Sequence, residues 1–221
     1  VTASKTLDGT TANTNGFQFS LKSIATSKSG LTLKNNNVDK TATSANGLVN
    51  FDKLVYDTED VGTYEYVMKE TAVAGDYIFD DTVYTLRVEV SVDPETTILT
   101  AKGTWYRGDD SVKAVTENDK IEGNPSFNNI SFATTDVSFN KNMDGQASKK
   151  AFDFTVQNVT SMNNGALVYK TDALNTFKNK YTNSVVDANS TVNVGTLKFS
   201  EAGTYAYRVA ETNKTDKSIK Y

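Results

Sequence analysis

The 221 residues of this sequence contain no cysteine, no histidine and only two prolines. Without cysteine there are no disulfides and no thiol nucleophile, and without histidine there is no Ser-His-Asp triad. Zinc sites that depend on imidazole or thiolate ligands are excluded for the same reason. Most common designs of an enzyme active site are therefore ruled out, and we expect neither a cofactor nor a metal.

Basic charge and long apolar runs are also scarce. The 23 Lys and Arg residues are outnumbered by 27 Asp and Glu, for a net charge of -4, so the chain offers no positive field for a phosphate backbone. No apolar run approaches membrane-spanning length, and any export signal or wall anchor is expected outside these residues. We therefore expect a globular chain that contacts neither nucleic acid nor a membrane.

What the sequence does contain is alternation of apolar and polar residues with a period of two, which is typical of half-buried strands. It recurs at residues 17–21, 64–68, 84–90, 152–156 and 205–209. Asn-Gly pairs, which favour tight turns, lie between these segments. The pattern predicts an all-β chain built as antiparallel β-sandwiches. Residues 170–180 are the exception, and they are compatible with a short helix or a loop.

The beginning of the chain recurs after its midpoint. Residues 1–9 align without gaps on residues 137–145, and GTYEYVMKET at 62–71 aligns on GTYAYRVAET at 203–212. This repetition predicts tandem Ig-like domains at residues 1–133 and 136–221. Only ten residues follow Glu211, so we expect the second domain to be incomplete at its C-terminal end. Its last strands either lie beyond this sequence or come from elsewhere in an assembly.

Each copy has a lysine in its first strand, Lys5 or Lys141, and a glutamate that ends the Tyr-x-Tyr strand, Glu70 or Glu211. A single strand lysine is usually an outward-facing residue that discourages aggregation. Retention of both residues in both copies favours a shared role instead. Alternation also places Glu70 on the same face as the tyrosines, which makes it an inward-facing residue.

A lysine and a glutamate buried together change each other's protonation. Burial lowers the pKa of the amine and raises the pKa of the acid, so the pair can be neutral. A neutral amine is a nucleophile, and a neighbouring carboxylic acid can polarise an amide carbonyl and carry protons. The missing reactant is a carboxamide or carboxyl group, and Asn128 and Asn129 at the end of the first copy offer two.

These residues resemble the pilin isopeptide-linkage domains of Gram-positive major pilins and surface adhesins. The resemblance covers residues 1 to about 133 and the first two thirds of a second domain. It rests on a Lys-x-Leu-x-Gly opening at 5–9, a Phe-x-Phe strand at 17–19, a Gly-x-Tyr-x-Tyr-x-x-x-Glu strand at 62–70, the Tyr-rich strand around Tyr84, and Phe-x-Asn at 127–129.

The resemblance implies an Ig-like sandwich in which a first-strand Lys and a last-strand Asn join spontaneously as an amide. Matched by position, Lys5 is the nucleophile, Glu70 the catalytic proton shuttle and Asn129 the acceptor. Asn128 is the fallback acceptor, because only one of two adjacent residues faces inward. In the second copy Lys141 and Glu211 match the cross-linking lysine and the catalytic glutamate, but the acceptor is absent from the chain.

The expected function is that of a structural stalk or shaft module of an extracellular, cell-wall-attached pilus or adhesin. The cross-link is a single self-modification, so the chain is not expected to be an enzyme. Its expected partners are neighbouring domains or subunits of the same fibre, with a host surface protein or glycan as a further candidate.

Two other interpretations remain open. The Lys-Glu pairs could be plain salt bridges, and the aromatic residues, Trp105 among them, could line the site of a ligand-binding adhesin domain that has no covalent bond. The acidic pairs Asp80-Asp81 and Asp109-Asp110 fit no calcium-loop pattern, so we expect them in solvated turns.

Overall fold

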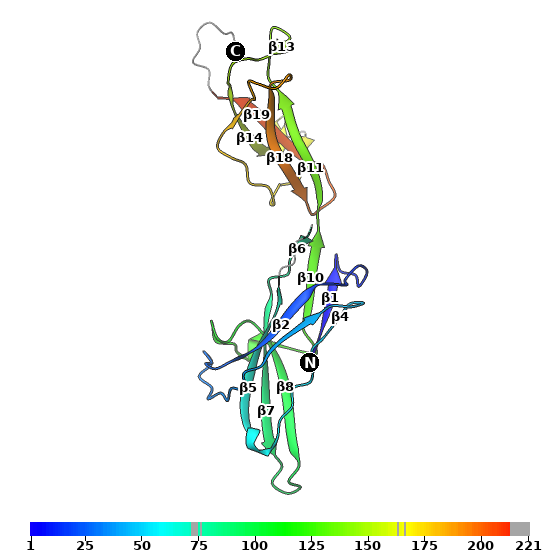
Figure 1. Ribbon diagram of the computed structural model, residues 1–221, viewed down its shortest axis with the longest axis vertical. Coiled ribbons are helices and arrows are strands. Elements are labelled where there is room, and N and C mark those ends of the chain that lie inside the picture. Colours follow the sequence, from blue (N-terminus) through cyan, green and yellow to red (C-terminus); the bar gives the residue numbers. More distant parts are fainter. Residues whose placement is uncertain (72–74, 76, 163, 166, 213–221) are drawn as a thin grey trace. The chain divides into compact units, whose positions relative to one another are not determined.

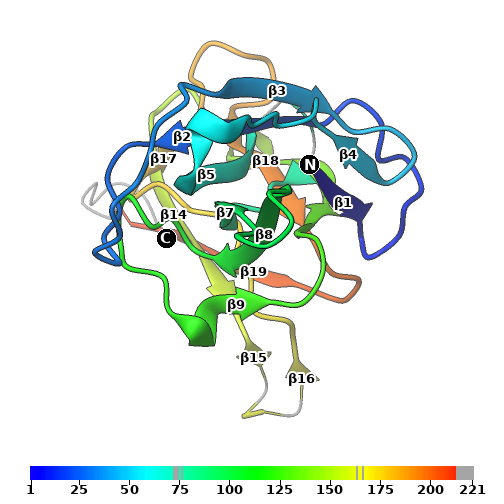
Figure 2. The ribbon, with the colours of Figure 1, turned by 90° about the horizontal axis from the view of Figure 1, so that it is seen from below.

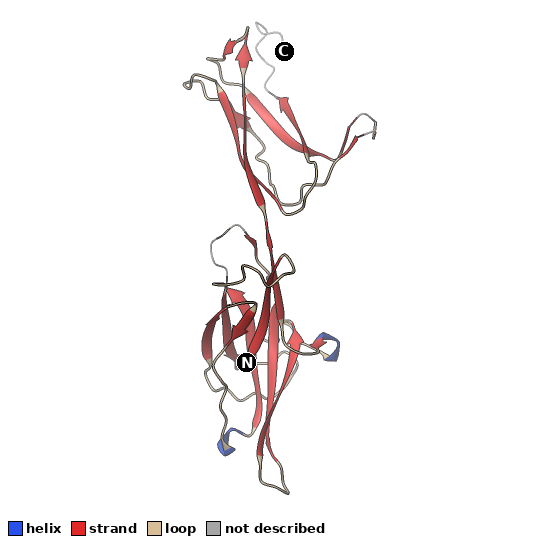
Figure 3. Cartoon of the chain, turned by 90° about the vertical axis from the view of Figure 1, so that its right-hand side faces the viewer, coloured by secondary structure: helices blue, strands red, loops and turns tan. Residues whose placement is uncertain are grey.

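The computed structural model describes residues 1–71, 75, 77–162, 164–165 and 167–212. Its described elements are strands apart from two short 3-10 helices, η1 (Thr58–Asp60) and η2 (Glu117–Asp119), so the expected all-β class is confirmed (Figure 3). No helix among the described residues is long and apolar enough to cross a membrane. The chain divides into two compact units, Val1–Ser131 and Phe132–Tyr221, a few residues earlier than the repeat alignment places the boundary.

Unit 1 consists of two β-sheets (Figure 1). The four-stranded sheet has the order β4 (Leu48–Asn50), β1 (Thr2–Leu7), β10 (Ser126–Ser131) and β6 (Tyr77–Ile78). The six-stranded sheet has the order β3 (Asp39–Thr43), β2 (Gln18–Ile24), β5 (Gly62–Thr71), β7 (Val83–Val92), β8 (Leu99–Arg107) and β9 (Lys120–Ile121).

The pairing of β1 with β10 departs from the antiparallel arrangement that the sequence predicted. These strands run parallel, with Lys5 opposite Phe127 and Leu7 opposite Asn129, whereas the other pairs between described strands of unit 1 are antiparallel. Parallel neighbours need a long connection, and here almost the whole of unit 1 supplies it. The pairing thus brings the first and last strands of the unit side by side.

The core of unit 1 lies between its two sheets. Phe127 on β10 is fully buried and meets Phe19 of β2 and Tyr84 of β7, with ring centroids 5.1 Å apart in both edge-to-face pairs. Such a pair stabilises the fold by about 0.5–1.5 kcal/mol beyond the stabilisation that comes from the buried area. Trp105 belongs to the same core and is 8% exposed. These aromatic residues hold β10 against the facing sheet.

Unit 2 repeats the first five main strands of unit 1. β11 (Ala133–Asn140) pairs antiparallel with β18 (Thr191–Phe199), and β14 (Asp153–Val159) lies between β17 (Tyr181–Thr182) and β19 (Ala206–Glu211). The remaining strands form the short pairs β12 (Asn142–Met143) with β13 (Gln146–Ala147) and β15 (Ser161–Met162) with β16 (Leu167–Val168), the latter labelled in Figure 2. Counterparts of β6 to β10 are missing among the described residues of unit 2.

Residues 170–180, for which the sequence allowed a helix or a loop, form a loop in unit 2. Asp172 organises it by accepting hydrogen bonds from the backbone N–H groups of Leu174 and Asn175. An aspartate that satisfies the backbone in this way stabilises a turn in place of a helix.

Candidate functional site

Lys5 faces the interior of unit 1. The alternation of β1 buries Ala3, Lys5 and Leu7, and Lys5 has no exposed surface. Its Nζ atom lies 4.6 Å from the centroid of the Phe17 ring. Burial lowers the pKa of Lys5, against the opposing effects of Glu70 and Asp80. The site therefore increases the fraction of neutral, nucleophilic amine.

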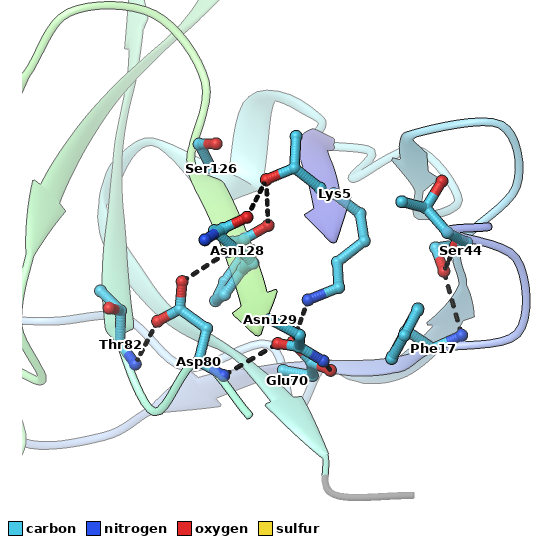
Figure 4. A network of polar contacts seen from close by, with 12 residues as sticks. Lys5, Phe17, Ser44, Glu70, Asp80, Thr82, Ser126, Asn128 and Asn129 are labelled. Carbon is cyan, nitrogen blue, oxygen red and sulfur yellow. Dashed lines mark hydrogen bonds and ion pairs between the residues drawn. The ribbon is translucent and has the colours of Figure 1, made fainter. Parts of the chain in front are cut away.

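Glu70, near the end of β5, connects the amine to a carboxamide. Its Oε2 atom lies 2.8 Å from Nζ of Lys5, and its Oε1 atom accepts a hydrogen bond of 2.7 Å from Nδ2 of Asn129. Figure 4 shows the three side chains converging from β1, β5 and β10. One carboxyl group is thus placed to move a proton between the amine and the amide nitrogen.

The two adjacent asparagines of β10 point in opposite directions. Asn129 is fully buried together with Phe127, whereas Asn128 is exposed. The Oδ1 atom of Asn128 accepts hydrogen bonds of 2.8 Å from Thr6 Oγ1 and from the Gly9 N–H. Of the two asparagines proposed as acceptors, Asn129 is the one that contacts Glu70.

Asp80 also belongs to the site, although the sequence placed it in a solvated turn. It is half-buried, and its backbone N–H donates a hydrogen bond of 2.8 Å to Oδ1 of Asn129. Its carboxylate accepts from the N–H groups of Thr82 and Asn128 (Figure 4). The expected turn is present, but its expected solvation was wrong for Asp80, because an Asp two residues before a Thr signals a local turn but not which strand the turn will contact.

Unit 2 contains half of the same arrangement. Nζ of Lys141 lies 2.8 Å from Oε2 of Glu211 and 4.3 Å from the centroid of the Phe152 ring. The Lys141 and Glu211 side chains are 18% and 16% exposed, whereas those of Lys5 and Glu70 are 0% and 1% exposed. Oε1 of Glu211 is buried and has no hydrogen-bond partner among the described residues. The equivalent atom of Glu70 is the one that accepts from Asn129.

The other acidic pair expected in a solvated turn is also placed differently. Asp110 is fully buried, and it accepts hydrogen bonds from the hydroxyls of Ser27 and Ser29 and from the Val115 N–H. Its own N–H donates to Oγ1 of Thr85 on β7. The pair does lie in a turn, but its expected solvation was wrong for Asp110, because the hydrogen bonds of Asp110 connect two loops to the six-stranded sheet, a contact that local sequence does not indicate. Among the described residues, no group of three or more acidic side chains could hold a metal ion.

Inside this β-sandwich one buried carboxyl group contacts both a buried amine and a buried carboxamide. These groups define a class of domain that has what is needed to form an internal amide. The chain belongs to the family of Spy0128-like isopeptide containing domains, FctA, whose model matches residues 1–131 and 137–221. The two matched segments correspond to the two copies seen in the sequence. The family that the sequence resembles is therefore confirmed.

Solved structures with a similar trace include the major pilin of Streptococcus pyogenes, at 16% identity and a TM-score of 0.39, with 99% of this chain and 83% of that chain covered. The T3.2 major pilin protein of the same organism has 19% identity and a TM-score of 0.36, with coverages of 97% and 82%. At these values the likeness carries no inference about the site. Comparison with curated protein sequences gave no match.

Proposed function

We propose that the chain is a structural shaft or stalk module of an extracellular surface fibre, and that unit 1 is closed by an amide bond between Lys5 and Asn129. The observation that carries this proposal is the buried Glu70 carboxyl group, which contacts the Lys5 amine and the Asn129 carboxamide at the same time. Membership of an isopeptide containing domain family supports it.

The reaction needs no group from outside the chain. The neutral Lys5 amine attacks Cγ of Asn129 and the new C–N bond forms in a tetrahedral intermediate, which collapses when the bond from Cγ to Nδ2 breaks. Glu70 takes a proton from the attacking amine and delivers it to Nδ2, which leaves as ammonia. The products are one amide and one ammonia, so the chain loses about 17 Da and does not turn over again.

The bond would stabilise unit 1 by restricting its unfolded state. It closes a loop of 124 residues (129 − 5). Treated like a disulfide, a loop of that length stabilises the fold by about 5 kcal/mol, which is comparable to the whole stability of an ordinary domain. In a module that bears load outside the cell and has no cysteine, such a link provides the covalent closure that a disulfide would otherwise provide.

The proposed location is outside the cell, in a fibre attached to the cell wall. The proposed partners are neighbouring domains or subunits of that fibre.

Unit 2 has the features of a half-site that a neighbouring segment could complete. A strand that carries an Asn and lies beside β11, as β10 lies beside β1, would bring a carboxamide to Oε1 of Glu211, for which the described residues supply no hydrogen-bond partner. Lys141 would then have the same surroundings as Lys5.

The test is the intact mass of the folded, purified chain after denaturation. One loss of about 17 Da is expected from amide formation at Lys5. The unmodified mass would contradict the proposal and leave the Lys5–Glu70 pair as a structural ion pair. The chain would then be better explained as an adhesin domain whose binding surface lies elsewhere.

A further inference from the structure

The side-chain carbonyl oxygen of Asn129 accepts a hydrogen bond from a backbone N–H that does not belong to β1, β5 or β10. The N–H of Asp80 donates to Oδ1 of Asn129 at 2.8 Å. Asp80 lies after β6, and β6 pairs antiparallel with β10, with Ile78 opposite Ile130. The pairing of these strands therefore delivers the N–H to the carboxamide from the side of β10 opposite β1.

This position matters for the chemistry because attack on Cγ transfers negative charge to Oδ1. A backbone N–H at 2.7–3.1 Å from the developing oxyanion is the geometry that stabilises a tetrahedral intermediate. Glu70 contacts the other atom of the same carboxamide, Nδ2. The carbonyl oxygen and the departing nitrogen of Asn129 thus have separate protein partners.

The Asp80 side chain fixes the position of its own N–H. Its carboxylate accepts 2.9 Å and 2.7 Å hydrogen bonds from the N–H groups of Thr82 and Asn128. One of these bonds closes the Asp80 turn, and the other attaches the turn to the residue before the acceptor. Burial raises the pKa of Asp80, but hydrogen bonds from Thr82 and Asn128 and the nearby Lys5 leave it below its ordinary value. The carboxylate therefore remains a charged acceptor at neutral pH.

The geometry points to Asp80 as a further functional residue of the cross-linking site: its backbone N–H is the oxyanion donor for Asn129, and its carboxylate is a positioning group that holds that N–H in register. This inference rests on the proposed Lys5–Asn129 reaction. The site then has three functional groups: the nucleophile, the proton shuttle and a group that polarises the acceptor. The segment that follows Glu211 in unit 2 lies outside the described residues from 213 onward.

The N–H can be tested without changing any side chain. Residue 80 is replaced by malic acid, the α-hydroxy analogue of aspartate, so that an ester oxygen takes the place of the N–H. The matched control carries the same ester at Asp81. Each chain is taken unfolded and uncross-linked from urea-solubilised inclusion bodies, diluted to fold at neutral pH, quenched at intervals and weighed. Rates are normalised to the folded fraction, followed by Trp105 fluorescence.

Loss of one oxyanion donor slows catalysis by about 100-fold or more in other sites, so the Asp80 ester should lose ammonia about 100-fold more slowly than the wild type and the Asp81 ester. If the Asp80 ester reacts at the wild-type rate, only the role assigned to the N–H is overturned. A wild-type chain that never loses ammonia would instead overturn the proposed function. The two failures are therefore distinguishable.

Asp80→Asn tests the positioning role of the carboxylate. The variant should react more slowly because asparagine cannot accept from both Thr82 and Asn128 as aspartate does. The midpoint of its rate against pH should also move to lower pH, since Asp80 and Glu70 are the charges that raise the pKa of Lys5 and one of them is removed. A slower rate with an unmoved midpoint would indicate general loosening and contradict the assigned role, as would an unchanged rate.

Discussion

Nζ of Lys5 and Oε2 of Glu70 lie 2.8 Å apart in a site where their side chains are 0% and 1% exposed. An ion pair removed from water to this degree costs desolvation energy that the attraction between the charges repays only in part. Burial lowers the pKa of Lys5, which relieves part of that cost by favouring the neutral amine, the species that amide formation requires. The expense of burying the pair is thus consistent with a reactive site.

Glu70→Gln should prevent the cross-link. Glutamine keeps the volume of the side chain but cannot carry a proton from the amine to the leaving nitrogen. The intact mass of the folded variant should therefore be the unmodified one. Glu89→Gln, which changes an exposed glutamate of β7 in the same unit, is the matched control and should keep the loss of about 17 Da. Full reaction of the Glu70 variant would show that the carboxyl group is dispensable.

Asn129→Ala and Asn128→Ala should have different effects. Without Asn129 there is no acceptor, so unit 1 should lose about 5 kcal/mol of stability and its melting temperature should fall by roughly 15 °C. Without Asn128 the cross-link should still form, and the lost hydrogen bonds from Thr6 and Gly9 should cost about 1 kcal/mol. Thermal unfolding and intact mass measure both effects. A cross-link lost in the Asn128 variant and kept in the Asn129 variant would reverse the assignment.

The rate of cross-linking should increase with pH. Burial lowers the pKa of Lys5, and the amine attacks only when it is neutral. The rate should therefore rise as pH rises through that lowered pKa, and should level off at a pH below the ordinary pKa of a lysine. Refolding at a series of pH values, with samples weighed at early times, gives this profile. A rate that is independent of pH would show that deprotonation of Lys5 does not limit the reaction.

Replacing each of the two equivalent lysines in turn should show which unit forms the cross-link. Lys5→Ala should abolish the loss of about 17 Da, whereas Lys141→Ala should leave it unchanged, because the Lys141 site has no described carboxamide partner. Intact mass is again the measurement, and each variant serves as the control for the other. Dependence of the mass loss on Lys141 would show that unit 2 already holds an acceptor.

Glu65 should make the stability of unit 1 depend on pH. This fully buried residue of β5 accepts a 2.7 Å hydrogen bond from Nε of Arg87, and burial raises its pKa to about 7. The folded state then binds more protons than the unfolded state, so stability is greatest below the ordinary glutamate pKa and falls as pH rises to about 7. A shift of this size corresponds to about 3 kcal/mol.

Urea unfolding of the uncross-linked Asn129→Ala variant at pH 5 and pH 8, with and without Glu65→Gln, checks this prediction. Glutamine cannot titrate, so the difference between the two pH values should shrink in the double variant. An equal pH dependence in both variants would assign it to other groups.

Period-two alternation was sufficient to predict the all-β class, and with internal repetition it selected Lys5 and Glu70 as a pair with a shared role. From the residues alone Asn128 and Asn129 both remained candidates, and the family resemblance selected Asn129. The class and the pair were predictable because alternation in a strand determines which side chains share a face. The parallel pairing of β1 with β10 was not predicted, because strand order depends on packing across the whole unit. The contribution of Asp80 was missed because its backbone N–H carries no residue-type signal. Burial of Asp110 likewise depends on two loops that meet only in the folded chain.

The most direct test of the central claim is tryptic digestion of the denatured chain followed by tandem mass spectrometry. Trypsin does not cleave after a lysine whose amine is in an amide, so a cross-linked Lys5 leaves residues 1–22 intact. We expect one branched product in which residues 1–22 are joined to residues 121–141 through Lys5 and Asn129, about 17 Da lighter than the two peptides together. Recovery of a free peptide ending at Lys5, with Asn129 unmodified in its own peptide, would contradict it.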